Sequence, residues 1–114
     1  MKKFLVLYKA SAEAFQQAMK DSTPEQQKAG MEAWMKWSQK AGPSLLDMGG
    51  PLGKSARVAT NGEVSTVVND LGGYSVMQAE SREALAGSLK EHPHLTMMAG
   101  SSIEVVEIMP IPGI

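Results

Sequence analysis

The stretch Phe-Leu-Val-Leu-Tyr at residues 4–8 decides the fold of this chain. An unbroken apolar run of this length predicts a β-strand that is covered on both of its faces. The run is shorter than the apolar core of a signal peptide, which needs about 7 to 15 residues, and no small-residue cleavage site follows it. We therefore expect it to be the first strand of a folded domain.

Two helices are expected after this strand. Apolar side chains recur at four-residue steps over residues 10–20 and predict a short helix. Thr23 then predicts an N-cap, Pro24 suits the first helical position, and Gln26 completes a capping box. Gly-Pro at residues 42–43 ends this second, longer helix.

The rest of the chain predicts mostly strands. Asn-Gly at residues 61–62 lies between two β-favouring runs, which is the strongest hairpin signal that a sequence offers. In chain order we expect a short strand at 44–48, hairpin strands at 56–60 and 63–68, a turn at 69–73, a strand at 74–79, a helix from Ser81 to about Glu91 that Pro93 ends, a loop or short turn of helix at 95–101, a strand at 102–109 and an extended tail at 110–114.

These elements give the order β-α-α-β-hairpin-β-α-β. Without the short helix and the hairpin the order is β-α-β-β-α-β, the ferredoxin-like split βαβ unit. The length of 114 residues fits one domain. We therefore predict a single α+β domain over residues 1–114.

The strands carry more apolar surface than one layer of helices can cover. In the last strand Ile103 and Val105 lie on one face, and Val106 and Ile108 lie on the other. Large apolar patches on a domain surface are typical of interfaces. We expect two sheets to pack face to face in a two-fold homodimer, which would form a dimeric α/β barrel. The alternative is a monomer whose hairpin folds over its own sheet.

Composition excludes several classes of function. There are 11 basic and 12 acidic residues, with a formal net charge of −1 and no basic block, which argues against nucleic acid as a partner. No apolar run approaches the length of a membrane span. Cysteine is absent, which excludes thiolate chemistry and indicates a cytoplasmic protein. We expect no cofactor.

The motifs, taken in order, resemble those of the YCII-related family, which includes proteins named for a DGPF motif. The resemblance covers nearly the whole chain. The matching stretches are residues 3–8, Gly49-Gly50-Pro51-Leu52, Gly73-Tyr74-Ser75-Val76 followed by Ala79-Glu80-Ser81, His92-Pro93-His94-Leu95, and residues 102–105 leading into 108–110. The DGPF tetrapeptide itself is absent, and Asn69-Asp70-Leu71-Gly72 stands in that region.

The resemblance implies a dimeric α/β barrel. It also implies a role on small organic molecules, since one branch of the family is described as a dehydrochlorinase of a chlorinated aromatic compound with a proposed His–Asp dyad. That dyad does not carry over. Met31 stands where the branch has its histidine, and His92 stands where it has its aspartate.

The candidate catalytic residues are His92, His94 and Asp47. His92 follows Leu85 and Leu89 on the inward face of the expected helix, at the C-terminal end where the helix dipole favours a protonated imidazole. The alternative is a helix-terminal histidine that satisfies carbonyl groups. We expect the rings of His92 and His94 to point apart across Pro93, so a metal site on the pair is not expected. Asp47 is either a solvent-facing carboxylate or a partner of a histidine in proton transfer.

Tyr8 and Trp34 are candidate ligand-binding residues, although buried tyrosines often bond only to backbone, and the tryptophan and methionines of the long helix are typical of a core.

Three functions remain open. The first is a cofactor-independent enzyme that acts on a small aromatic or carbonyl-bearing metabolite by histidine acid/base chemistry. The second is a non-catalytic dimeric protein that binds a small molecule, and the third is an accessory domain that binds another protein.

Overall fold

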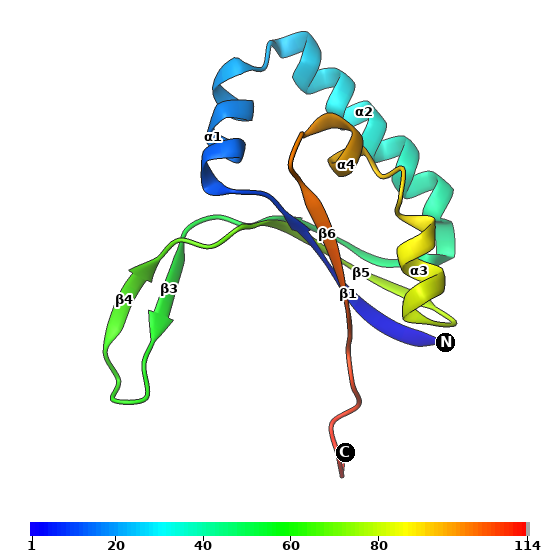
Figure 1. The fold of residues 1–114 in the computed structure, drawn as a ribbon. Coiled ribbons are helices and arrows are strands. Elements are labelled where there is room, and N and C mark those ends of the chain that lie inside the picture. The colour runs from blue at the N-terminus through cyan, green and yellow to red at the C-terminus, as the bar shows by residue number, and fades with distance from the viewer. Residues whose placement is uncertain (114) are drawn as a thin grey trace.

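The computed structural model describes residues 1–113. Its elements are β1 (Lys2–Lys9), α1 (Ala12–Asp21), α2 (Pro24–Ala41), a 3₁₀ turn η1 (Gly42–Ser44), β2 (Leu45–Pro51), β3 (Ser55–Val58), β4 (Val64–Val67), β5 (Leu71–Ala79), α3 (Arg82–Ser88), α4 (Pro93–Met97) and β6 (Ser102–Glu107) (Figure 1). Of the expected tail, Ile114 lies outside the described residues.

One four-stranded sheet organises the domain. Its strand order is β2-β5-β1-β6, and every neighbouring pair is antiparallel. With α2 between β1 and β2, and α3 and α4 between β5 and β6, this is the ferredoxin-like arrangement. The prediction of a ferredoxin-like α+β fold with an added hairpin and short helix is confirmed.

The core lies between the sheet and the helices. Phe4, Val6 and Tyr8 on β1 are buried together with Met77 on β5 and with Leu85 and Leu89 on and just after α3. Their alternation follows the two-residue period of a strand. Leu5 and Leu7 face the other side and are only half-buried. The first strand is therefore fully covered on one face, not on both.

Helix α2 begins and ends at the positions that its sequence predicts. The Thr23 hydroxyl accepts a hydrogen bond from the Gln26 backbone N–H at 3.1 Å, and the Gln26 side chain accepts one from the Thr23 N–H at 2.9 Å. This reciprocal pair is the capping box. At the other end, Gly42 has a φ of +54°, a value that favours glycine, and Pro43 follows.

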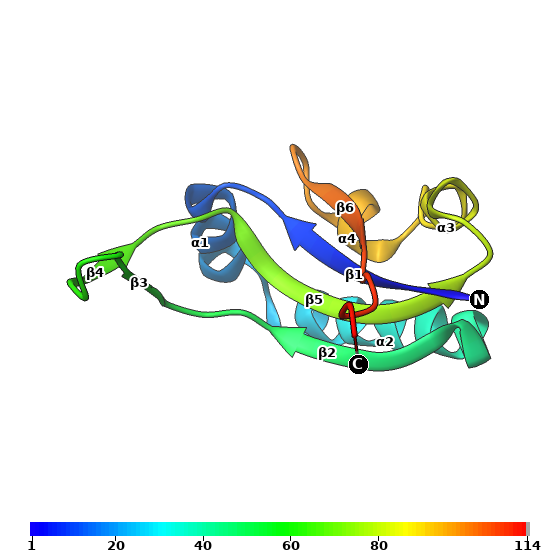
Figure 2. The ribbon, with the colours of Figure 1, turned by 90° about the horizontal axis from the view of Figure 1, so that it is seen from below.

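The hairpin is a separate two-stranded sheet. Val58 pairs with Val64 and Ser55 with Val67, and the turn between the strands includes Gly62 at a φ of +87°. Figure 1 shows the hairpin projecting beyond the end of the main sheet, and Figure 2 shows the face opposite the helices uncovered by it. The hairpin therefore does not fold over its own sheet.

Several boundaries differ from the predictions, including the ends of β2, β6 and both hairpin strands. Residues 71–73, expected in a turn, belong to β5, where Leu71 pairs with Lys9 and Gly73 pairs with Tyr8 and Pro51. The helix that Ser81 caps ends at Ser88 and not near Glu91. His92 is the N-cap of the new helix α4 and does not lie at the C-terminus of a helix. The dipole argument for a protonated His92 was therefore wrong.

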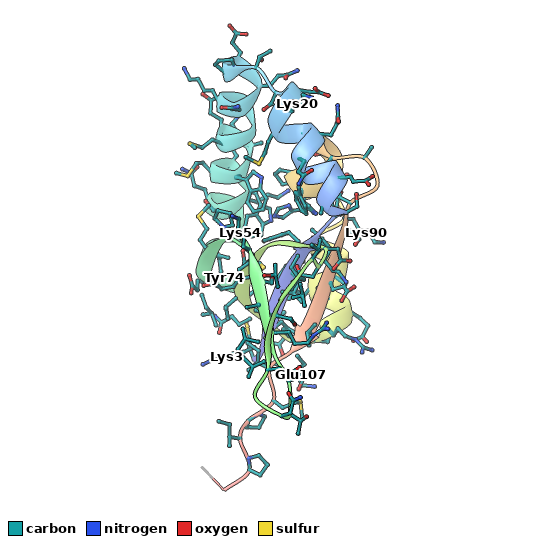
Figure 3. The ribbon with its side chains drawn as sticks, turned by 90° about the vertical axis from the view of Figure 1, so that its left-hand side faces the viewer. Lys3, Lys20, Lys54, Tyr74, Lys90 and Glu107 are labelled. Atoms are coloured by element: carbon teal, nitrogen blue, oxygen red, sulfur yellow. The ribbon has the colours of Figure 1, made fainter. Side chains whose placement is uncertain are left out.

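The sheet face away from the helices carries an apolar row. Leu5 lies opposite Val76 on one side and Val106 on the other, and the Val106 side chain is 46% exposed. Seen from the hairpin end, Lys20 on α1 lies on the helical side of the sheet, whereas the tail after Glu107 extends to the opposite side (Figure 3). The radius of gyration is 15.9 Å, against about 13 Å for a compact domain of this length.

Within residues 1–113, no helix combines the length and the apolar character needed to cross a lipid bilayer.

Candidate functional site

A cavity of about 510 Å³ lies at one end of the sheet, beneath α1, α2 and α4. Its walls come from the last residues of β1 and β2, the first residues of β5, and the three helices. Most of the side chains are apolar or aromatic. They include Tyr8, Phe15, Met31, Trp34, Met48, His94, Met97 and Met98. Its volume lies within the usual range for small-molecule sites.

A larger groove of about 780 Å³ runs between α2 and α3. Its walls carry Lys36, Lys40 and Lys90 and no histidine. We place the candidate site in the smaller cavity because several aromatic side chains and one histidine converge there.

Irregular strand pairing shapes the rim of the cavity. The pairing of β1 with β5 shifts between Tyr8 and Lys9, which leaves Gly72 without a partner on β1. A side chain at Gly72 would meet the Phe15 ring at 2.0 Å, so the glycine makes room for that ring. On β2, Gly49 has a φ of +72°, and a Cβ there would lie 1.9 Å from the Tyr74 carbonyl oxygen. Bulges of this kind often occur beside functional sites.

Tyr8 is held by a directed chain of hydrogen bonds. The Ser75 hydroxyl donates to the backbone carbonyl of Met48 at 2.8 Å. That hydroxyl has one proton, so at its contact with Tyr8, also 2.8 Å, it must accept from the phenol. Burial raises the pKa of Tyr8 to about 12, while the Ser75 bond lowers it in part. Tyr8 is therefore a neutral phenol that donates its proton to the Ser75 hydroxyl.

His94 is buried, and its ring has an assignable tautomer. Nε2 lies 2.9 Å from the backbone carbonyl oxygen of Lys9. A carbonyl can only accept, so Nε2 carries a proton, and in the neutral ring Nδ1 keeps a free lone pair. Within residues 1–113, the one fully enclosed side-chain nitrogen or oxygen without a partner is Nε2 of His92. Nδ1 of His94 has no partner within the described chain either, so it must be accessible.

His92 lies under the cavity and does not line it. Its side chain is 1% exposed, and its Nδ1 accepts a hydrogen bond from the backbone N–H of His94 at 3.0 Å. Nε2 therefore carries the proton. Burial, with a smaller contribution from nearby His94, lowers the pKa of His92 to about 4. His92 is a neutral N-cap of α4.

An aromatic cluster surrounds His92 and continues into the cavity wall. The His92 ring lies 4.3 Å from Trp37 and 4.6 Å from Trp34 between centroids, both edge to face, and 4.9 Å from Tyr8. Tyr8 also contacts the ring of His94 at 5.6 Å. Both histidines thus pack on one tyrosine.

Asp47 is exposed and outside the cavity walls. Its Oδ1 accepts a hydrogen bond from the backbone N–H of Gly49 at 2.9 Å, two residues along the chain. This is a local turn bond of the kind that aspartate commonly makes. The carboxylate therefore supports the bend in β2 and does not pair with a histidine.

Lys9 fixes the backbone that His94 contacts. Its Nζ lies 2.6 Å from a Glu104 carboxylate oxygen and 3.3 Å from one of Asp70. The hydrogen bond to Glu104 contributes most to raising the pKa of Lys9. These bonds join the ends of β1 and β6 to the segment before β5, and so hold the Lys9 carbonyl under the imidazole.

The structure brings together three of the five residues predicted for the site: Tyr8, Trp34 and His94. It keeps His92 and Asp47 apart from the cavity. Sequence reasoning missed Phe15, Ser75 and Gly72. Gly72 falls in the turn predicted at residues 69–73, but a glycine in a strand is also a signal of a bulge.

No three His, Cys, Asp or Glu side chains in residues 1–113 are grouped so that they could hold a metal ion. The walls of the cavity contain no Lys, Arg, Asp or Glu from the described chain. What the arrangement offers chemically is one imidazole in the wall of an apolar, aromatic cavity, with a ring nitrogen that has no partner in the described chain.

Strand order and cavity together define a ferredoxin-like α+β domain with a histidine-containing apolar pocket at the end of its sheet. No family model and no curated protein matches the sequence. Among solved structures, a 5-chloro-2-hydroxyhydroquinone dehydrochlorinase from Burkholderia phenoliruptrix AC1100, in complex with 2,5-dihydroxybenzoquinone, is similar at 18% identity and a TM-score of 0.47, over 90% of each chain. Membership of the YCII-related family stays a prediction.

Proposed function

We propose that this protein is a cofactor-independent enzyme that acts on a small metabolite in the apolar pocket, with His94 as general base. The observation that carries the proposal is the free Nδ1 lone pair of His94, which follows from the bond between Nε2 and the Lys9 carbonyl. A base must reach the proton that it removes. His94 lines the cavity, and its bonded side is fixed by the backbone.

His92 and Asp47 have no part in this proposal as proton-transfer groups. His92 uses Nδ1 to cap α4, and its Nε2 is enclosed without contact to solvent. Asp47 is bonded to its own turn. The acid/base chemistry expected from three residues is therefore assigned to His94 alone, with Tyr8 and Trp34 as binding walls.

A second function is a non-catalytic small-molecule-binding protein. It is supported by the same cavity and by the absence of Lys, Arg, Asp and Glu from its described walls, which leaves His94 without a charged partner there. Most enzymes that use acid/base catalysis orient the base with further polar groups. The backbone carbonyl of Lys9 takes that part here in the enzyme proposal.

We also propose that the protein is a homodimer through the open face of its sheet. The support is the apolar row of Val76, Leu5 and Val106 across three strands, together with a radius of gyration above that of a compact domain. A second copy of the same face would cover this row by a two-fold arrangement.

The enzyme proposal is tested with a screen of small, uncharged aromatic and carbonyl compounds for binding and turnover. The variant is His94→Gln, whose amide N–H can still donate to Lys9 while its side chain is no longer a base. We expect ligands to bind both proteins and turnover to fall by about 10²- to 10⁴-fold in the variant. Asp47→Asn, whose side-chain oxygen can still accept from the Gly49 N–H outside the cavity, is the matched control and should retain turnover.

Binding without turnover in the wild type would favour the second function. If no compound in the screen binds the wild type, the cavity is not a small-molecule site and both functions fail.

A further inference from the structure

Two polar side chains in the pocket wall, Tyr8 and His94, have hydrogen-bond directions that follow from their fixed partners. The Ser75 hydroxyl donates a hydrogen bond to the Met48 carbonyl, so the phenol of Tyr8 donates its own proton to the Ser75 oxygen. The phenol oxygen can only accept any further hydrogen bond. Nε2 of His94 donates a hydrogen bond to the Lys9 carbonyl, so in the neutral ring Nδ1 can only accept a hydrogen bond.

The Tyr74 side chain does not supply a hydroxyl that could donate a hydrogen bond inside the pocket. It pairs with Leu7, and alternation along β5 puts its side chain on the open face of the sheet, away from Tyr8. The backbone of Gly73 and Tyr74 belongs to the pairing of β5 with β1 and β2.

The lack of charged side chains in the pocket wall restricts the class of ligand further. A buried carboxylate or ammonium group needs a partner of opposite charge. The described walls of the pocket contain no Lys, Arg, Asp or Glu. While the His94 ring is neutral, its Nδ1 lone pair and the lone pairs of Tyr8 would also repel the oxygen atoms of an anion.

We infer that the Tyr8–His94 side of the pocket selects an uncharged, ring-bearing ligand that carries a hydroxyl or N–H donor, and that it discriminates against ether and carboxylate ligands of the same shape. This inference rests on the proposed function, because it concerns the same pocket. The aromatic walls at Tyr8, Trp34 and Phe15 accept the ring, and the donor group pairs with Nδ1 of His94. For the enzyme proposal, this donor is the group whose proton the base removes.

The test compares four probes with one ring system: 2-naphthol, 2-methoxynaphthalene, 2-acetylnaphthalene and 2-naphthoate. Affinities for the wild-type protein are measured by calorimetry at neutral pH. We expect 2-naphthol to bind about tenfold or more tightly than the ether, because the ether leaves the imidazole lone pair unpaired. The ketone should lie between them, because the Trp34 indole N–H in the pocket wall can donate to its carbonyl oxygen. We expect 2-naphthoate to bind most weakly.

A second measurement reports on Nδ1 of His94 itself. The ¹⁵N chemical shift of Nδ1 in His94 should move when 2-naphthol binds and stay close to its free value with 2-methoxynaphthalene. Equal affinities for the naphthol, the ether and the ketone would overturn the inference and leave the pocket as a binding site. If none of the four probes binds, both the inference and the proposed function fail.

Discussion

The backbone N–H of His94 donates a hydrogen bond to Nδ1 of His92 at 3.0 Å. This single bond makes His92 the N-cap of α4 and fixes the tautomer of its buried ring. It also sets the direction in which the chain turns after Pro93, so that the His94 ring reaches the Lys9 carbonyl. One histidine is thus a structural support for the other.

The buried state of His92 predicts a loss of stability in mild acid. Its pKa is lowered to about 4 from 6.5, so between these values the unfolded chain binds a proton that the folded chain does not. Stability from this group is complete above pH 6.5 and falls as the pH drops toward 4, by up to roughly 3 kcal/mol. Urea denaturation at a series of pH values measures it.

The matched variant for this prediction is His92→Asn. Asparagine can accept from the His94 N–H as an N-cap, but it does not titrate. We expect the variant to be less stable at pH 7, because it loses the ring packed on Trp34 and Trp37. Its stability should change less between pH 6.5 and 4. An unchanged slope in that range would assign the acid sensitivity to other groups.

The parts of the fold that local signals determine could be predicted from the sequence. The capping box at Thr23 and Gln26 and the turn at Gly62 lie where their residue types place them, because each depends on neighbours a few positions away. The extent of β5 could not be predicted, since Gly72 and Gly73 are turn formers by type. Gly73 becomes strand only by pairing with Tyr8 and Pro51, and Gly72 lies at the register shift beside it.

The same distinction applies to the site. Tyr8 and Trp34 could be chosen because large aromatic side chains on a buried strand and helix face converge on the core. The separate positions of His92 and His94 depend on where a helix ends, and element boundaries are the least certain part of a sequence prediction. The bond of Ser75 to Tyr8 joins residues 67 positions apart, and no local pattern indicates it.

The hydrogen-bond chain at Tyr8 predicts that removal of the Ser75 hydroxyl and removal of the Tyr8 hydroxyl lower the unfolding free energy by different amounts. Ser75→Ala removes the donor to the Met48 carbonyl and the acceptor for the Tyr8 phenol at once. Tyr8→Phe leaves the bond from Ser75 to Met48 in place. We expect a loss of about 2 to 3 kcal/mol of unfolding free energy for Ser75→Ala, and about 1 kcal/mol for Tyr8→Phe.

Chemical denaturation of both variants measures the difference. If Tyr8→Phe costs as much as Ser75→Ala, the bond from Ser75 to the Met48 carbonyl adds no stability and the assigned direction is wrong.

Two neighbouring glycines on β2 predict opposite responses to alanine. A Cβ at Gly49 would lie 1.9 Å from a backbone oxygen of Tyr74, and the residue has a positive φ of 72°. A Cβ at Gly50 would meet nothing within 4 Å, and its φ is not positive. We expect Gly49→Ala to cost roughly 2 to 4 kcal/mol, through strain and the displaced strand, and Gly50→Ala to cost less than about 0.5 kcal/mol. Thermal unfolding of the two variants under the same conditions compares them, and a similar loss in both would mean that the bulge adapts without strain.

The apolar row on the open sheet face predicts that a charge there separates two chains. Val106→Glu adds a carboxylate beside Leu5 on the face that we propose for the dimer, where a second sheet would have to bury it without a partner. We expect light scattering to give the mass of two chains for the wild type and of one chain for this variant at micromolar concentration. Met19→Glu is the control, because Met19 is 78% exposed on α1, which lies on the helical side of the sheet (Figure 1). It should leave the dimer intact. A wild-type mass equal to one chain would rule out the dimer, and the apolar row would then be covered by something other than a second copy.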